Sequence, residues 1–346
     1  MKRIEQYDRA LRSFTKKVLQ LPKSTATSFL YMKTRDGGLG LPCIFERVMK
    51  FLRGQLRNLQ TSSDLWIIAL AQTQLVQKLQ RRIEKFNDRN WQQEFSRTWQ
   101  GHGADSFKAN IVANFWLPGQ IKFFKGRFYN QAVQLWTQLF PTRLIQYNTD
   151  SATNMCRHGY PSQETIQHVL QSCPFVQGAR IKRHERVVNS LAEYPDLIIV
   201  KEGVAYVVDV TFAYDHPEVF KRAAEEKVRK YSALTPGDIP GLGEIKAVEV
   251  IPIVLGARGG WRRANTKLDK VLKLPRSFAK INIIQTIKES IIMLRLHSSL
   301  QRRNSRYGNT NNTQSRISSM NGMNVGINGM NVGPASRNAA GVNGGA

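Results

Sequence analysis

The stretch GVAYVVDVTFAYD, residues 203–215, decides how the second half of this chain should fold. Its valines and aromatic residues are typical of a buried β-strand, because branched and aromatic side chains pack well on a pleated sheet. Asp209 stands in the middle of this apolar run. A lone carboxylate among apolar side chains is strongly unfavourable, so Asp209 must be paired, protonated or bound to a cation.

The segments on either side of this strand predict a compact α/β unit. A first strand, DLIIV at 196–200, is joined to it by the short turn KEG. A helix at 219–234 and a strand at 246–256 follow, and a last apolar helix is predicted at 281–297. Apolar residues at helical spacing alternate here with short branched runs, which favours a sheet covered by helices.

The first half of the chain is predicted to be helical. The run DLWIIALAQTQLVQKLQRRIEKF at 64–86 has helical spacing, and Asp64 is placed to cap it. The expected fold class is α+β: a helical region at 1–150, a zinc-knuckle-like insert at 151–180, an α/β core at 181–300 and a tail at 301–346. The tail carries the repeat NGMNVGI NGMNVGP at 321–334 and is expected to be disordered, because Asn, Gly and Ser cannot build a core.

The chain is strongly basic. Its 346 residues include 51 Lys and Arg against 25 Asp and Glu, a net charge of +26. Such an excess indicates a polyanionic partner, either nucleic acid or an anionic membrane surface. No run approaches the roughly 18 apolar residues of a transmembrane helix, and the charged start has no apolar signal-peptide core. We therefore expect a nucleic-acid partner, and neither a membrane nor a small-molecule substrate.

Two basic segments are candidates for nucleic-acid contact. In the first, Lys122, Lys125 and Arg127 alternate with Phe123, Phe124, Phe128 and Tyr129. This pattern fits phosphate contact with base stacking, and it fits equally well a helix whose aromatic residues belong to the core. The second is the predicted helix around 181–191, where Arg180 and Arg183 add positive charge. His184 shares a predicted apolar face with Ile181, Val188 and Leu191, so it is either a nucleic-acid contact or a core histidine.

The three cysteines, Cys43, Cys156 and Cys173, are too few for a disulfide framework and indicate a reducing compartment. Cys156 and Cys173 are close in sequence with histidines between them, which is typical of metal ligands.

The α/β unit contains a candidate site for a divalent cation. Asp196 opens the first strand and Asp209 lies in the next, so the two carboxylates can converge on one side of a hairpin. Like charges at close range need a cation between them, and hard oxygen ligands suit Mg²⁺ or Mn²⁺. The alternative is that Asp209 pairs with a buried Lys or Arg.

The helix after this hairpin carries a lysine on its apolar face. At 100° per residue, Lys227 falls at the centre of a stripe made by Phe220, Ala223, Ala224, Val228, Tyr231 and Leu234. Lys230 lies at the edge of that stripe. A lysine placed there could activate a water or stabilise a pentavalent phosphate, or it could be only the salt-bridge partner of Asp209.

The pattern of Asp196, Asp209 and a helical lysine resembles the PD-(D/E)xK nucleases, in the variant whose lysine has moved to the helix; the usual lysine slot holds Thr211. The segment CRHGYPSQETIQHVLQSCPFVQGARIKRHERVV at 156–188 looks like the zinc knuckle and Arg-His helix of non-LTR retrotransposon polyproteins of the restriction-like-endonuclease type. These elements insert into ribosomal RNA genes. KKVLQLPKSTATSFLYMKTRDGGLGLP (16–42) and GRFYNQAVQLWTQLFPTR (126–143) resemble the segment after the reverse transcriptase thumb.

The resemblance implies a nuclear protein that nicks target DNA and primes reverse transcription from the nick, with DNA and element RNA as partners. Asp196 and Asp209 would hold Mg²⁺ or Mn²⁺, and Lys227 would orient a water, with Tyr231 in support. Lys230 is the reserve candidate for the lysine. The chain has no paired aspartates of a polymerase site, so it is expected to supply only the endonuclease portion.

The chain departs from the family pattern at two places. Cys156, His168 and Cys173 match three zinc ligands, but Tyr160 stands where the family has its second cysteine, leaving His158 as a substitute. A loop without zinc is the alternative. Between the helix ending near 191 and Pro195 the family has a further strand, whereas this chain has only AEY. An inactive nucleic-acid-binding remnant is therefore the second interpretation of function.

Overall fold

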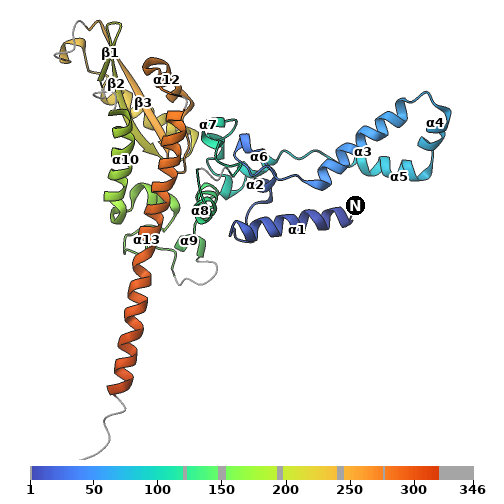
Figure 1. The fold of residues 1–346 in the computed structure, drawn as a ribbon, viewed down its shortest axis with the longest axis horizontal. Helices are drawn as coiled ribbons and strands as arrows, with labels where there is room; N and C mark the ends of the chain where they lie inside the picture. Colours follow the sequence, from blue (N-terminus) through green and yellow to red (C-terminus); the bar gives the residue numbers. More distant parts are fainter. Residues whose placement is uncertain are drawn as a thin grey trace, which may run out of the picture. The chain divides into compact units, whose positions relative to one another are not determined.

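A computed structural model describes residues 2–119, 123–146, 153–192, 198–239, 245–275 and 277–318 (Figure 1). Two of the predicted site residues, Lys122 and Asp196, lie outside these ranges, and so does the repeat at 321–334. The chain divides into two units, Met1–Ser299 and Leu300–Ala346.

The N-terminal part is helical, as predicted. Its elements are α1 (Lys2–Val18), α2 (Thr27–Tyr31), η1 (Thr34–Asp36), α3 (Ile44–Thr61), α4 (Leu65–Ala71), α5 (Gln74–Glu84), α6 (Trp91–Ser96), η2 (Trp99–Gly101), η3 (Ala104–Ser106), α7 (Ile111–Asn114), α8 (Arg127–Trp136) and α9 (Arg143–Gln146).

The predicted helix over 64–86 forms as two helices. The carboxylate of Asp64 accepts the backbone N–H of Trp66 at 2.8 Å and caps α4, which confirms the predicted cap. The helix breaks after α4 because Thr73 is extended and its hydroxyl caps α5 by accepting from Val76. A second, longer-range cap fixes α3: buried Asp8 of α1 accepts the N–H groups of Ile44 and Phe45, each at 2.8 Å.

The core of the helical part is built around Trp136 of α8. Its ring stacks on Phe29 of α2 and Phe95 of α6, with centroids 5.4 and 5.6 Å apart. Gly37, in the glycine-rich turn after α2, has a φ of +96°, and a Cβ there would lie 2.5 Å from the Trp136 ring. The turn needs glycine both for its left-handed backbone and for this close approach.

The strands predicted from the sequence form a three-stranded sheet in the described part of the chain. It contains β1 (Ile198–Lys201), β2 (Val204–Ala213) and β3 (Ala247–Gly256), in the order β1-β2-β3. β1 pairs with β2 in an antiparallel sense and β2 with β3 in a parallel sense. In this register Ile198 faces Val207, and Asp209 faces Pro252.

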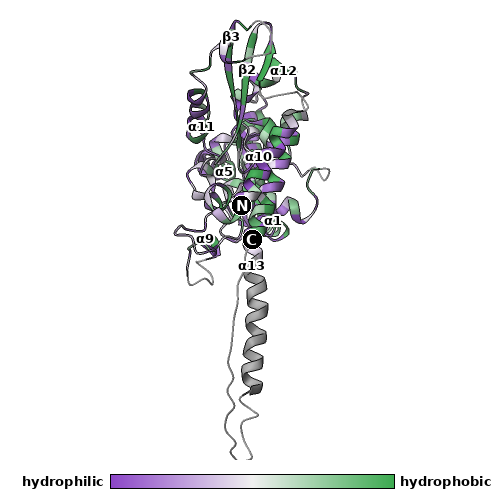
Figure 2. Cartoon of the chain, turned by 90° about the vertical axis from the view of Figure 1, so that its left-hand side faces the viewer, coloured by the Kyte–Doolittle hydropathy of each residue, from purple (hydrophilic) through white to green (hydrophobic). Residues whose placement is uncertain are grey.

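Helices cover both faces of the sheet. On one face, α11 (Pro217–Lys230) packs Phe220 and Ala224 against Ala213 of β2 and Val254 of β3. On the other face lie α10 (Gln177–Ala192) and the first turns of α13 (Ser277–Ser318), whose residues up to Leu294 belong to the same core as Val208 and Val210 of β2. Figure 2 shows α11 and α10 on opposite sides of the strands. The remaining elements are the π-turn η4 (His168–Ser172), η5 (Pro174–Val176), η6 (Pro236–Asp238), η7 (Arg263–Asn265) and α12 (Thr266–Leu272).

The last helix is longer than predicted. We expected a helix at 281–297 and an unfolded tail from 301, whereas α13 runs from Ser277 to Ser318. Ile283, Ile287 and Ile291 are fully buried on the sheet. No proline interrupts the stretch from 277 to 318, so the sequence contains no residue that forces the helix to end at 297.

One hydrophobic core joins the regions that the sequence separates at 150 and 180. Its buried members include Trp136 of the helical part, Cys173 of the insert and Ile287 of the last helix. A buried ion pair strengthens this junction. Asp215, just after β2, accepts the backbone N–H groups of Arg258 at 2.7 Å and of Gly260 at 2.8 Å.

The guanidinium of Arg258 reaches from this ion pair into the helical part. It donates to the backbone carbonyl of Trp136 at 3.0 Å and to that of His102 at 3.1 Å, and its Nε lies 3.4 Å from Asp215. Side chains of Asp215 and Arg258 are 0% and 1% exposed. A Cβ at Gly256 would lie 1.8 Å from the Asp215 carboxylate, so glycine is required beside it.

Candidate functional site

The structure brings together four of the five predicted catalytic residues. Asp209 projects from β2 toward α11, where its Oδ1 lies 3.0 Å from Lys227 Nζ. The Tyr231 hydroxyl donates to Asp209 Oδ2 at 2.9 Å, and Lys230 Nζ lies 3.7 Å from the same oxygen. The alternation of β2 and the helical period of α11 place these groups side by side, since four residues separate Lys227 from Tyr231. The fifth residue, Asp196, lies outside the described part of the chain.

This cluster is open to solvent on one side. The side chains of Asp209, Lys227 and Lys230 are 13%, 23% and 59% exposed. The Asp215–Arg258 pair, by contrast, is closed off. Lys230 also donates to the Tyr231 hydroxyl at 2.9 Å, and this hydrogen bond is the main reason why the pKa of Lys230 is raised. Two lysines and a phenol on one carboxylate form a positively charged rim that suits an approaching phosphate.

The sequence and the strand register also relate Asp209 to the first strand. Ile198 pairs with Val207, and Asp209 follows Val207 by two residues. Asp196 precedes Ile198 by two residues in the sequence. The Asp209–Lys227 contact is also the ion pair that the alternative interpretation of Asp209 predicts.

Cys156, His168 and Cys173 meet in a loop that we call the Cys–His loop, residues 155–173. Their ligand atoms lie within 4.8 Å of one another, and all three residues are buried. A π-turn explains the spacing of the last two, because the N–H of Cys173 donates to the carbonyl of His168 at 2.7 Å, five residues back. This closure places the two side chains on the same side of the turn.

His158 is not brought to these three donors. Its ring stacks on Phe175 with centroids 3.7 Å apart, and its Nε2 lies 2.9 Å from the backbone carbonyl of His297. The predicted substitution of His158 for the missing cysteine would therefore require breaking both contacts. Tyr160 packs against the core and offers no thiolate.

The aromatic residues of the first basic segment belong to the core. Phe124 is 4% exposed and packs edge-on against Trp116, and the Tyr129 hydroxyl donates to the carbonyl of Leu117 at 2.7 Å. This arrangement favours the second interpretation of the segment, a helix start with core aromatics. Lys125 and Arg127 are exposed and remain available to phosphate, whereas Lys122 lies outside the described residues.

The second basic segment requires a correction. Arg183 is 2% exposed, and its guanidinium donates to Ser290 at 3.1 Å and to the carbonyl of Leu170 at 3.3 Å while covering Phe212. Burial lowers the pKa of Arg183 to about 10. It is a structural residue rather than a nucleic-acid contact.

The predicted apolar face of this helix is likewise rotated. Arg183 and Val187 face the core, whereas Ile181 is 50% exposed. Arg180 is half-buried and donates to the carbonyl of Cys173. His184 lies on the surface, with its Nε2 3.0 Å from the carbonyl of Val210. The sequence pattern failed here because a long, hydrogen-bonded arginine took the position expected of an apolar residue.

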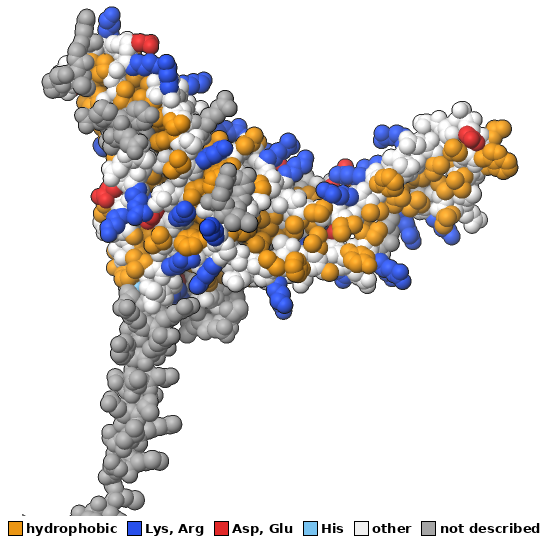
Figure 3. All heavy atoms as spheres, viewed as in Figure 1, with side chains coloured by type: hydrophobic (Ala, Val, Ile, Leu, Met, Phe, Trp, Pro, Cys, Tyr) orange, Lys and Arg blue, Asp and Glu red, His pale blue; other side chains and the backbone are white. Residues whose placement is uncertain are grey.

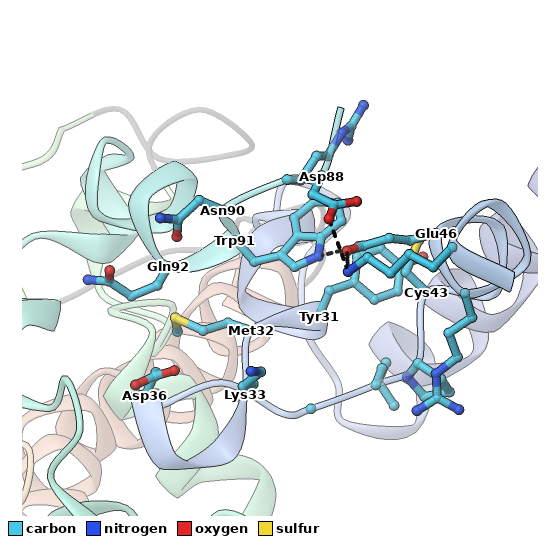
Figure 4. A pocket seen from close by; sticks show the side chains of 16 residues that line it. Tyr31, Met32, Lys33, Asp36, Cys43, Glu46, Asp88, Asn90, Trp91 and Gln92 are labelled. Atoms are coloured by element: carbon cyan, nitrogen blue, oxygen red, sulfur yellow. Dashed lines mark hydrogen bonds and ion pairs between the residues drawn. The ribbon is translucent and has the colours of Figure 1, made fainter. Parts of the chain in front are cut away.

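A pocket that the sequence did not indicate lies between α2, α3 and the start of α6 (Figure 4). Tyr31 and Trp91 form its wall, and Trp91 Nε1 donates to Glu46 at 2.9 Å. Lys50 pairs with Glu46 at 2.7 Å and approaches Asp88 at 3.8 Å. These polar groups satisfy one another, and no member of the Asp209 cluster lines the pocket.

Lysine and arginine side chains are scattered over the face of the molecule seen in Figure 3, and acidic ones are few. This agrees with the net charge of +26. Among the described helices, none is long and apolar enough to cross a membrane.

Comparison with known proteins gives the class to which this chain is related. No protein-family model matches it. Over most of its length the chain is similar to Pol polyproteins of retrotransposable elements.

The particular relatives are named as retrovirus-related Pol polyproteins from the type-1 retrotransposable element R2 of Popillia japonica. One is 28% identical over 333 residues, covering 85% of this chain and 68% of the relative. A second is 25% identical over 320 residues, covering 79% and 68%. A third is 27% identical over 299 residues, covering 77% of this chain and 41% of the relative. The similarity supports a relationship to non-LTR, R2-type polyproteins.

Proposed function

We propose that this chain is a metal-dependent DNA endonuclease module of a retrotransposon polyprotein, and that it nicks target DNA to prime reverse transcription. The observation that carries the proposal is the convergence of Lys227 and Tyr231 on the solvent-accessible carboxylate of Asp209. A strand carboxylate and a helical lysine 3.0 Å apart are two of the protein groups that metal-assisted phosphodiester hydrolysis uses. The similarity to retrotransposon polyproteins gives this chemistry a context.

The residues present fit a hard divalent cation. Asp209 offers two carboxylate oxygens, and we propose that Asp196, two residues before β1 in the sequence, supplies the second carboxylate. Both would hold Mg²⁺ or Mn²⁺, which prefer oxygen ligands. When bound, the ion would polarise the scissile phosphate and lower the pKa of an attacking water.

The cations of α11 then act on the substrate. Lys227, released from Asp209, would orient the water or neutralise charge developing on the phosphate. Tyr231 would hold Asp209 Oδ2 in place through the bond seen at 2.9 Å. Lys230, the reserve candidate, lies at the rim and would meet the phosphate first.

DNA affinity would come from exposed cations such as Lys125 and Arg127 rather than from a single groove. Affinity of this kind falls steeply as salt rises, because each phosphate contact releases counterions. Element RNA is the second proposed partner, since the relatives are Pol polyproteins, and action on chromosomal DNA would place the protein in the nucleus.

The test is nicking of supercoiled plasmid by the full chain with Mg²⁺ or Mn²⁺, with plasmid in excess so that turnover is measured. Asp209→Asn and Lys227→Ala should each lower nicking by about 10²-fold or more, as loss of a transition-state contact does. Arg222→Ala, on the exposed side of the same helix, is the matched control and should nick normally.

Retention of DNA by each variant separates catalysis from binding. Nicking lost with DNA retention unchanged would support the proposal. Folded natural protein that binds DNA in a salt-sensitive manner without nicking would contradict it and favour the inactive remnant.

A further inference from the structure

Three buried donors in the Cys–His loop leave one position of a tetrahedral metal site open. The Sγ atoms of Cys156 and Cys173 are 3.9 Å apart, and both thiols are free. This separation is near the edge of about 3.8 Å between two sulfurs on one zinc ion, with Zn–S of about 2.3 Å. It is also far beyond a disulfide bond. The two sulfurs are therefore spaced for a shared ion.

His168 has a ring nitrogen without a hydrogen-bond partner, and its ligand atom lies within 4.8 Å of the two sulfurs. Its Nδ1 lies 3.3 Å from the Ser172 hydroxyl, whereas its Nε2 is buried without a hydrogen-bond partner. Buried polar atoms are almost always satisfied, so an orphaned imidazole nitrogen beside two thiols indicates a missing ligand. A zinc ion would satisfy it.

A further donor, His297 of α13, lies beside Cys156: with Glu164, these two form a second group whose ligand atoms lie within 4.8 Å of one another and which shares Cys156 with the first group. His297 is 2% exposed, and its Nε2 lies 3.6 Å from Cys156 Sγ. A nitrogen and a sulfur on one tetrahedral zinc ion are about 3.6 Å apart. His297 and Cys156 lie 141 positions apart in the sequence.

An acidic residue is placed to orient this imidazole. Glu164 Oε2 lies 4.0 Å from His297 Nδ1, and Glu164 is fully buried. Arg157 holds the carboxylate through Nη2 at 2.5 Å and Nε at 2.8 Å, and the Arg143 N–H adds a bond at 2.8 Å. At 4.0 Å this contact is longer than a hydrogen bond, so the ring would have to shift toward Glu164 to make the bond that carboxylates usually make to metal-binding histidines.

We propose that His297 is the fourth ligand of a zinc ion held by Cys156, His168 and Cys173, with Glu164 as the residue that positions its ring. His158 has a different part in this arrangement: stacked on Phe175, it lies 2.9 Å from the His297 carbonyl and fixes that turn of α13. The metal site would then fasten the last helix of the core to the Cys–His loop. The inference goes beyond the nuclease proposal and does not depend on it.

The experiment measures zinc in the full-length protein. X-ray absorption at the zinc edge of the natural protein should find two sulfur and two imidazole ligands, and metal analysis should find one zinc per chain. In a chelator competition, His297→Ala should weaken zinc affinity by at least about a hundredfold, since even outer partners contribute 10–100-fold. His297→Cys should restore affinity, and His158→Ala, which removes only a contact to the His297 backbone, should weaken it far less than His297→Ala does.

Several results would overturn the inference. Folded natural protein without zinc would do so, as would a single imidazole in the absorption spectrum, a measurement that does not rely on any variant folding. Unchanged affinity in His297→Ala, or a loss confined to His158→Ala, would assign the fourth position elsewhere. None of these results bears on plasmid nicking, so the two proposals fail separately.

Discussion

The buried pair of Asp215 and Arg258 gives the most stringent test of how this fold is held together. Replacing Arg258 by Leu leaves a carboxylate without its cation at a site where both side chains are at most 1% exposed. Breaking such a pair from one side costs about 3–5 kcal/mol. The carbonyls of Trp136 and His102 also lose their donors, at about 1 kcal/mol each.

The free energy of unfolding should therefore fall by about 4 kcal/mol or more in Arg258→Leu. At roughly 2–4 °C per kcal/mol, Tm should drop by about 8–16 °C. Urea and thermal unfolding of the full chain measure both quantities. Arg222→Leu, an exposed arginine of α11, is the control and should stay within about 0.5 kcal/mol of the natural protein.

A second substitution distinguishes an unpaired charge from a simple loss of packing. Asp215→Asn alone should destabilise the protein, because it weakens the pair. In the Arg258→Leu background it should be neutral or stabilising, because it removes the uncompensated charge. A loss of less than about 1 kcal/mol in Arg258→Leu, or an equal loss on Asp215→Asn in both backgrounds, would show that no uncompensated charge is left in the core.

Four further substitutions test other parts of the structure. Asp8→Ala removes the buried cap of α3 and should lower the free energy of unfolding by about 1–2 kcal/mol in urea; no change would contradict the cap. Arg183→Met should destabilise the protein by about 1–3 kcal/mol and leave the salt dependence of DNA binding unchanged. Lys125→Ala should preserve stability and reduce the slope of log K against log salt by about 1. A reduced slope in Arg183→Met with unchanged stability would make Arg183 a nucleic-acid contact after all. Burial lowers the pKa of His102 in the folded protein, so the unfolded chain binds a proton at this histidine more readily than the folded chain does. The free energy of unfolding should therefore be highest above about pH 6.5 and should fall as the pH drops below that value. His102→Gln should flatten that fall in unfolding experiments between pH 5 and 8, and an unchanged profile would show that other groups cause it.

The elements and one side-chain cluster followed from local periodicity. A period of two along β2 and of 3.6 along α11 was enough to place Asp209 and Lys227 on facing surfaces, and they lie 3.0 Å apart. Both periods are properties of short stretches, so they can be read without knowing the rest of the fold.

Long-range packing was beyond such reading. His297 meets Cys156 from 141 residues away, and no local spacing links the two. The charge of Arg183 predicts a position on the surface, but Ser290 and the carbonyl of Leu170 accept hydrogen bonds from its guanidinium inside the core. Nothing in the strand segment itself indicates that Asp215, its last residue, is buried in an ion pair. The sequence feature related to it is the pair Gly256 and Gly260, which leave room for its carboxylate.

The core that the regions on either side of residues 150 and 180 share has a practical consequence for dissecting this chain. The domain boundaries predicted from the sequence at residues 150 and 180 suggest that the α/β part could be expressed as a separate fragment, or cassette. A cassette starting at 181 would lack the carbonyls of Trp136 and His102 that bind Arg258, and the thiol of Cys173 behind α10. If such a truncated protein were inactive, the loss would be due to unfolding rather than to a missing catalytic residue. Domain swaps between relatives should therefore exchange residues 1–299 as one piece.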